Sequence, residues 1–201
     1  MTGRQKAKSE ETQRRVLEAA ISAIENGGME AVQIRKIAAQ AGYSVGSVYK
    51  HYEDQDALIA AVDTVTLGRI KTSMSEAVDG IEDPIEQLKA LARTYLAFAR
   101  NHRNLWKTLF THQLPEGREA PESHIQGTVD LLAFIAGPLK QLDPGLDDAK
   151  LSVRTRTCFA ALHGLVAISL EERFVGLPDD EMDREMMFLV ERLAGKGAGQ
   201  G

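Results

Sequence analysis

The sequence predicts an all-α protein of about nine helices. Along most of its 201 residues, apolar side chains recur at the three- and four-residue spacing of an amphipathic helix. The segments between these stretches carry helix stop and start signals, such as Gly27-Gly28 and Asp83-Pro84. No segment shows the alternation of apolar and polar residues that is typical of a strand. We expect the helices to divide into an N-terminal domain at residues 1–52 and a larger domain at 53–201.

The first expected helix begins near Ser9, which can act as an N-cap with Glu10 and Glu11 in the first turn. Its buried stripe consists of Val16, Leu17, Ala20, Ile21 and Ile24. Residues 1–8 show no periodicity and predict a solvated arm. The alternative for this arm is a minor-groove contact through Arg4, Lys6 and Lys8.

Residues 33–52 read as two short helices joined by a tight turn, a helix-turn-helix. Ile34 and Ile37 have helical spacing, Gly42 supplies the backbone freedom of the turn, and Ser44 fits the N-cap of the second helix. Val48 and Tyr52 can pack back against the first helix. The residues left near the outward side are Val45, Gly46, Ser47, Tyr49, Lys50 and His51. The spacing alone also fits two core helices of any small bundle.

The segment AGYSVGSVYKHYEDQDALIAAV at residues 41–62 resembles the DNA-binding signature of the TetR family of bacterial repressors. The match extends from about Ser9 to Val62. It implies a three-helix DNA-binding domain in which Val45, Gly46 and Ser47 face base edges and Tyr49, Lys50 and His51 hold the DNA backbone. Gln33 and Ser44 complete the expected DNA contacts. Gln33 stands where the family commonly has Thr, and Gln55 stands where it commonly has Lys, so Gln55 brings no charge.

The charge distribution agrees with a DNA-binding end. The net charge is −5, which by itself argues against a nucleic-acid partner. Residues 1–52, however, hold eight Lys or Arg and five Glu, a charge of +3, and leave −8 for the remainder. A basic N-terminal quarter on an acidic body favours DNA contact through one end of the protein.

The composition favours a soluble protein of the cytoplasm. The apolar runs are too short to span a bilayer, and the charged start of the chain is unlike a signal peptide. Cys158 is the single cysteine, so no intramolecular disulfide forms, which fits a reducing compartment.

Six further helices are expected after the turn. A long helix follows an Asp54 N-cap and runs to about Val78, and another starts with Pro84 at its first position. The remaining four are expected at residues 104–113, 122–141, 151–174 and 178–193. The helix at 151–174 is apolar around most of its circumference, and the last one carries a stripe of Met and Leu. A domain of this size cannot bury such a helix alone, so both predict a homodimer with a four-helix interface.

Aromatic side chains in the larger domain are the candidate ligand contacts. Aromatic residues spaced as Tyr95, Trp106, Phe110 and Phe134 are more often core than pocket, but the resemblance implies an apolar effector cavity in this domain. The helices near residues 84, 105 and 122 would bring these rings to a common centre, under a loop at 114–123. His163, followed by Gly164, either contacts the ligand or bonds an internal partner, with Gly164 allowing close helix packing.

No enzyme motif is present. The sequence lacks H-E-x-x-H, G-x-S-x-G, a P-loop and a cysteine pair. His102, His112 and His124 lack the spacing that preorganises metal ligands, so neither a metal nor a cofactor is expected. The sequence therefore predicts a homodimeric repressor that binds a palindromic double-stranded DNA operator and is released by a small apolar effector, without membrane association. The alternatives are a DNA-binding protein without an effector, and an enzyme or lipid carrier on the same all-α fold without DNA binding.

Overall fold

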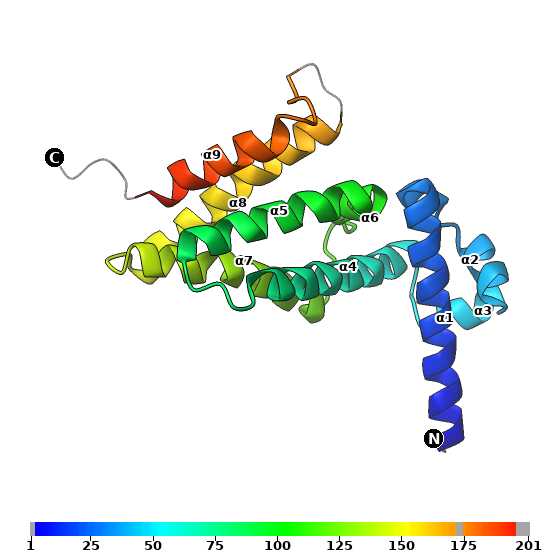
Figure 1. Ribbon diagram of the computed structural model, residues 1–201. Helices are drawn as coiled ribbons and strands as arrows, with labels where there is room; N and C mark the ends of the chain where they lie inside the picture. The colour runs from blue at the N-terminus through cyan, green and yellow to red at the C-terminus, as the bar shows by residue number, and fades with distance from the viewer. Residues whose placement is uncertain (1–2, 172–174, 196–201) are drawn as a thin grey trace. The chain divides into compact units, whose positions relative to one another are not determined.

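The computed structural model describes residues 3–171 and 175–195, and all regular structure in them is helical, without a strand (Figure 1). This confirms the predicted all-α fold. The elements in chain order are α1 (Gly3–Gly27), the 3-10 turn η1 (Met29–Ala31), α2 (Ile34–Ala41), α3 (Val45–Tyr49), α4 (Gln55–Val78), α5 (Pro84–Asn101), α6 (Arg103–Thr111), α7 (Glu122–Leu142), α8 (Asp148–Leu170) and α9 (Met182–Ala194). Within the described ranges, no helix is long and apolar enough to cross a membrane.

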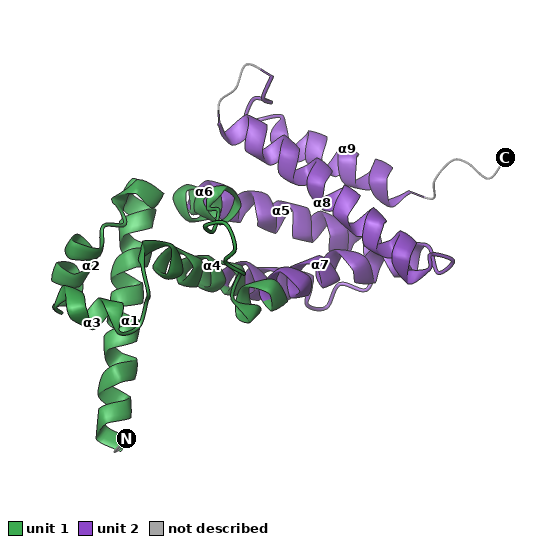
Figure 2. Cartoon of the chain, turned by 180° about the vertical axis from the view of Figure 1, so that it is seen from behind, with its two compact units in different colours: residues 1–68, 102–126 green, residues 69–101, 127–201 purple. Residues whose placement is uncertain are grey.

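The chain forms two compact units, which Figure 2 shows in different colours. Unit 1 comprises residues 1–68 and 102–126, and unit 2 comprises 69–101 and 127–201. Unit 1 is larger than the N-terminal domain expected at residues 1–52, because the start of α4, all of α6 and the following loop belong to it.

The core of unit 1 brings the helix-turn-helix together with α1, α4 and α6. The apolar stripe of α1 is buried as expected, with Val16, Ala20 and Ile24 fully inaccessible. It packs in one cluster with residues of the other elements, among them Ile37, Val48, Leu58 and Leu105. Full burial of each aliphatic side chain contributes about 1.5–3 kcal/mol, so this cluster fixes α2 and α3 on α1.

The start of α1 differs from the sequence prediction. Residues 3–8 are helical and exposed, so the helix begins at Gly3 and Ser9 lies in its interior; residues 1–2 of the expected arm lie outside the described residues. The reason is that Arg, Gln, Lys and Ala favour helix even without an apolar stripe. Lys6 also pairs with Glu10 across one turn at 3.9 Å. At the other end α1 stops at Gly27, before Gly28 with its φ of 72°.

Unit 2 is built around α5, which packs against both α8 and α9. Its buried side chains include Leu91, Leu96 and Phe98 of α5 together with Val166 of α8 and Met186 of α9. The helix expected at 151–174 is α8, of which residues 172–174 lie outside the described part. The last helix starts at Met182 rather than at Pro178, because residues 178–181 form a turn ahead of it.

Candidate nucleic-acid interface and effector cavity

The turn between α2 and α3 depends on Gly42. This residue has φ 77° and ψ 32°, the left-handed conformation that side chains disfavour. Its N–H donates to the carbonyl of Ala39 at 3.1 Å, and the N–H of Tyr43 donates to that of Ala38 at 2.9 Å. These two bonds form a Schellman motif, which satisfies the last carbonyls of α2 and reverses the chain. The expected role of Gly42 is confirmed.

Helix α3 is held by a cap at its start and a buried face. The Oγ of Ser44 accepts a hydrogen bond from the N–H of Ser47 at 3.2 Å, as an N-cap does. Val48 is fully buried and Tyr52 is 5% exposed, so both pack inward as expected. The Tyr52 hydroxyl also donates to the carbonyl of Gln13 in α1 at 3.4 Å, and burial raises its pKa.

The predicted DNA-binding residues lie on α3 and next to the ends of α2 and α3, and all but Val45, which packs against the core of unit 1, are free of that core cluster. Tyr49 is 52% exposed, and Gly46 and Lys50 are exposed as well. The other predicted residues are the exposed Gln33 and Ser44 and the half-buried Val45, Ser47 and His51. A Cβ built on Gly46 would meet only the Ser44 Oγ, at 3.9 Å. Packing within the chain therefore does not require a glycine there.

Arg15 and Arg118 support the helix-turn-helix from positions far away in sequence, and spacing could not reveal either contact. The guanidinium of Arg15 in α1 lies 5.7 Å from the ring centre of Tyr43 in the turn, a cation–π contact. At the start of α4, the Asp54 carboxylate accepts from the N–H of Ala57 at 2.8 Å and pairs with Arg118 at 2.7 Å. The bond from Ala57, helped by Arg118, lowers the pKa of Asp54. The expected N-cap role of Asp54 is confirmed.

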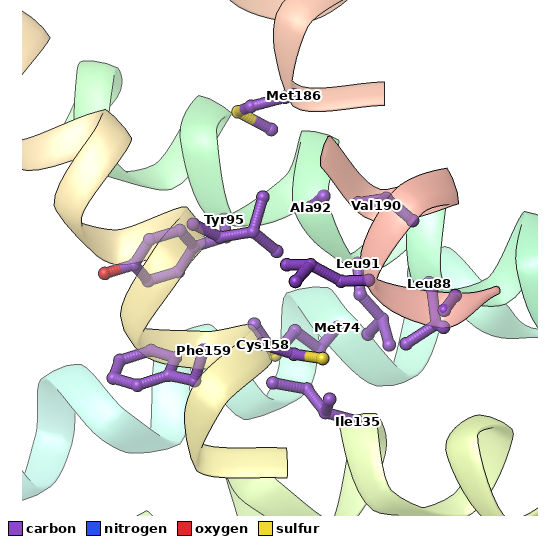
Figure 3. A pocket seen from close by; sticks show the side chains of 13 residues that line it. Met74, Leu88, Leu91, Ala92, Tyr95, Ile135, Cys158, Phe159, Met186 and Val190 are labelled. Atoms are coloured by element: carbon purple, nitrogen blue, oxygen red, sulfur yellow. The ribbon is translucent and has the colours of Figure 1, made fainter. Parts of the chain in front are cut away.

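Unit 2 encloses an apolar cavity of about 50 Å³. Figure 3 shows side chains from α4, α5, α7, α8 and α9 facing a common centre. Its walls are almost entirely hydrocarbon and sulfur, and they include Met74, Leu91, Tyr95, Ile135, Cys158, Phe159 and Met186. A space of this size holds a small apolar group, whereas binding sites for whole organic ligands measure about 300–1,000 Å³. A larger ligand must therefore displace side chains, and the two methionines adapt most easily.

Tyr95 brings a polar group to the edge of this cavity. Its hydroxyl oxygen and Nδ1 of His163 lie 2.7 Å apart and share a hydrogen bond. The His163 ring stacks on Phe159 with 5.5 Å between ring centres, and burial lowers the pKa of His163. Burial therefore favours the neutral form of the imidazole. This bond is an internal partner for His163, one of the two roles that the sequence left open, and a ligand contact by His163 stays a prediction.

The five predicted ligand contacts are divided between the two units. Tyr95 lines the cavity, His163 lies directly behind it, and Phe134 is a half-buried residue of α7 outside the cavity lining. Trp106 and Phe110 belong to unit 1, where their ring centres are 5.5 Å apart. The ligand contacts of these aromatic residues remain predictions. Met74 and Cys158, which sequence spacing did not single out, do line the cavity.

Two family matches show to which protein family the chain belongs. Residues 16–62 match the family described as "Bacterial regulatory proteins, tetR family". Residues 88–193, more than half of the chain, match "Tetracyclin repressor-like, C-terminal domain". The chain belongs to the TetR family. It is therefore a TetR-family DNA-binding transcriptional regulator, and this family is not one of enzymes.

Solved structures share the TetR fold. A protein of unknown function from Rhodococcus sp. RHA1 is 23% identical with a TM-score of 0.73, over 90% of this chain and 94% of that one. The regulator FadR from Bacillus subtilis, in complex with stearoyl-CoA, is 16% identical with a TM-score of 0.69, over 90% and 97%. FadR from Bacillus halodurans, a fatty acid degradation regulator, is 16% identical with a TM-score of 0.68, over 94% and 97%. No curated protein matches the sequence.

Proposed function

We propose that this TetR-family regulator is a homodimeric repressor, which binds a palindromic operator through α3 and is released by an apolar effector bound in unit 2. The observation that carries the proposal is the geometry of α3. Val48 and the half-buried Val45 hold one side of this short helix against unit 1. The other side presents Gly46, Ser47 and Tyr49, and Lys50 and His51 follow directly after the helix. Such a helix fits the major groove.

The proposed roles follow from size and charge. Val45, Gly46 and Ser47 are small enough to approach base edges on the groove floor, and the chain's own packing does not explain a glycine at position 46. Tyr49, Lys50 and His51 can donate hydrogen bonds to phosphate oxygens. Gln33 and Ser44 lie exposed at the starts of α2 and α3, where they can donate to the same backbone.

The first experiment is selection of operators from random duplex DNA, followed by fluorescence anisotropy with the selected sequence. We expect a palindrome whose half-sites are about 34–36 Å apart, or a multiple of this distance. A single unrepeated half-site would contradict the dimeric mode of binding. Saturable affinity that is equal for selected and scrambled duplexes would contradict sequence-specific readout by α3.

The proposed dimer interface lies on α8 and α9. Val153 and Ile168 of α8 are 66% and 38% exposed, and Phe188 of α9 is 52% exposed, which is unfavourable for apolar side chains in water. Gly164 lies on the same side of α8, and a Cβ built on it would meet no atom within 4 Å in its own chain. A second copy packing there would cover the apolar residues and use the small glycine for close approach.

Light scattering tests the dimer against the 22.0 kDa monomer. Phe188→Glu and Gly164→Leu should dissociate the protein without loss of helix content, because both positions are open within one chain. Val129→Glu is the matched control, since Val129 of α7 is equally exposed, at 53%, and lies off the proposed interface. Dissociation by Val129→Glu alone would move the interface to α7.

The cavity supports an effector with an apolar chain. Because the space is small in this conformation, the effector would bind an expanded state of unit 2 and shift the protein toward it. Straight-chain acyl groups are the first probes, since FadR from Bacillus subtilis binds stearoyl-CoA in its structure and the walls here are hydrocarbon. Tyr95 and His163 would orient the polar end of the ligand.

Release of the operator by fatty acids or acyl-CoA of graded length tests this proposal. Ala92→Leu fills the cavity from α5 and should abolish the response while operator binding persists, because Ala92 lines the cavity. Ala97→Leu is the control on the exposed side of the same helix. The fluorescence of Trp106, the single tryptophan, reports whether that residue contacts the ligand. Equal loss of response in both variants would place the effector elsewhere.

A further inference from the structure

Unit 1 contains a second cavity with a different chemical character. It measures about 270 Å³ and lies beside the first turns of α4. Its walls are Ala60, Asp63, Leu109, His112, Leu114, Arg118, Ala120, Pro121 and His124. It is separate from the apolar cavity of unit 2, with which it shares no residue.

A buried carboxylate forms one wall of this cavity. Asp63 is 2% exposed, and its Oδ2 lies 2.9 Å from Nδ1 of His112, which donates to it. Its other oxygen, Oδ1, is fully buried and has no protein hydrogen-bond partner. Burial raises the pKa of Asp63, while the bond from His112 opposes this effect. A buried carboxylate oxygen without a hydrogen-bond donor is unfavourable, so a ligand that brings a donor to Oδ1 would bind favourably here.

His112 supplies a second atom that can pair with a ligand. When Nδ1 donates its hydrogen to Asp63 and the ring carries no second hydrogen, Nε2 has a lone pair that can accept a hydrogen bond from a ligand. Nε2 is buried without a hydrogen bond, with the Asp56 carboxylate 3.5 Å away. Arg118, the cation in the lining, is paired with Asp54 at 2.7 Å and lies 3.8 Å from Glu53. The acidic groups around the cavity therefore outnumber its permanent cations.

We propose that this cavity binds a small aliphatic primary ammonium ion. The ammonium group has three N–H donors, which can pair with Asp63 Oδ1 and His112 Nε2, and its charge offsets the buried carboxylate. The alkyl part would lie against Leu109, Leu114 and Pro121. An anion would face the carboxylate of Asp63, and no group of three or more metal-ligating side chains is arranged for a metal in the described residues.

Binding at this position would act on the DNA-binding unit itself. Asp63 lies on α4, whose first turn carries the Asp54 cap and follows directly on Tyr52, the buried anchor at the end of the helix-turn-helix. A ligand that ties α4 to His112, just past the end of α6, would restrict the support on which α3 rests. This role does not depend on the apolar effector proposed for unit 2.

Isothermal titration of the full-length protein with n-butylammonium chloride tests the proposal. We expect saturable binding by this ion and none by tetramethylammonium, which has the charge without N–H donors, or by n-butanol, which has no charge. Asp63→Asn should weaken the affinity roughly tenfold or more, because a hydrogen bond to a charged group is lost. Asp79→Asn, at an exposed site after α4, is the control and should bind as the wild type does.

Each other outcome overturns the inference. Equal binding of n-butylammonium and tetramethylammonium would mean that no N–H donor is recognised. The absence of saturable binding by the wild type would mean that the Asp63–His112 pair is only a structural element of unit 1. Saturable binding of Zn²⁺ without binding of n-butylammonium would replace the ammonium site with a metal site. If Asp63→Asn fails to fold, the comparison of the three probes on the wild-type protein still shows whether the cavity binds a primary ammonium ion.

Discussion

Replacement of Gly42 by alanine tests the turn that positions α3. At the φ of 77° that Gly42 adopts, a residue with a side chain raises the free energy of the folded state by about 1–2 kcal/mol. A Cβ at position 42 would meet no atom within 4 Å, so no steric clash adds to this cost. Alanine also lowers the entropy of the unfolded chain, which returns about 0.4–1 kcal/mol. The net loss of unfolding free energy should be about 1 kcal/mol, or roughly 2–4 °C in Tm for a chain of this length.

A second glycine in unit 1 provides the matched control. Gly68 lies inside α4 with equally open space around its Cβ position and no positive φ, so Gly68→Ala should stabilise the protein by about 0.5–1 kcal/mol. Urea denaturation followed by Trp106 fluorescence reports on unit 1, which contains this single tryptophan. A Gly42→Ala variant as stable as the wild type would refute this reasoning. Equal losses of unfolding free energy in Gly42→Ala and Gly68→Ala would also refute it, because the left-handed conformation at Gly42 would then not explain the loss.

Lys50→Ala should reduce the slope of log affinity against log salt concentration by about one, because one phosphate contact is lost. Ser47→Ala should instead change the preference among operators. Both effects are measured by fluorescence anisotropy in a salt series, and a Lys50→Ala variant that changes the operator preference but keeps the salt slope would contradict these assignments. Asp54 has a lowered pKa, so its charge stabilises the fold above the unfolded-state pKa. Asp54→Asn should therefore be less stable at neutral pH and equal to the wild type in acid below the folded-state pKa, as denaturation at both pH values will show. Tyr95→Phe should lower the unfolding free energy by about 0.5–1.5 kcal/mol, because the hydrogen bond to the half-buried His163 is lost. Calorimetry that finds an unchanged Tm would contradict this role of the bond.

The helix-turn-helix was predictable from sequence because its signals are local. Gly42 and Ser44 act through bonds to residues within five positions of them, so a short window of sequence contains the cause and the effect. The contact between Tyr95 and His163 spans 68 positions, and periodicity does not say which helices meet. The same limit applies to Met186, which belongs to the Met and Leu stripe that the sequence predicts at the dimer interface. It is fully buried within its own chain.

The charged tip of α1 was not predictable because it has no apolar stripe to reveal it. Because residues 3–8 are helical, the exposed side chains of Arg4 and Lys8 lie four positions apart on the same face of the helix. Like charges at this spacing destabilise an isolated helix by about 0.2–0.5 kcal/mol. Salt or a nearby polyanion screens this repulsion. A polyanion such as DNA near this end of α1 would therefore remove the repulsion between Arg4 and Lys8 and favour the helical form of the first two turns.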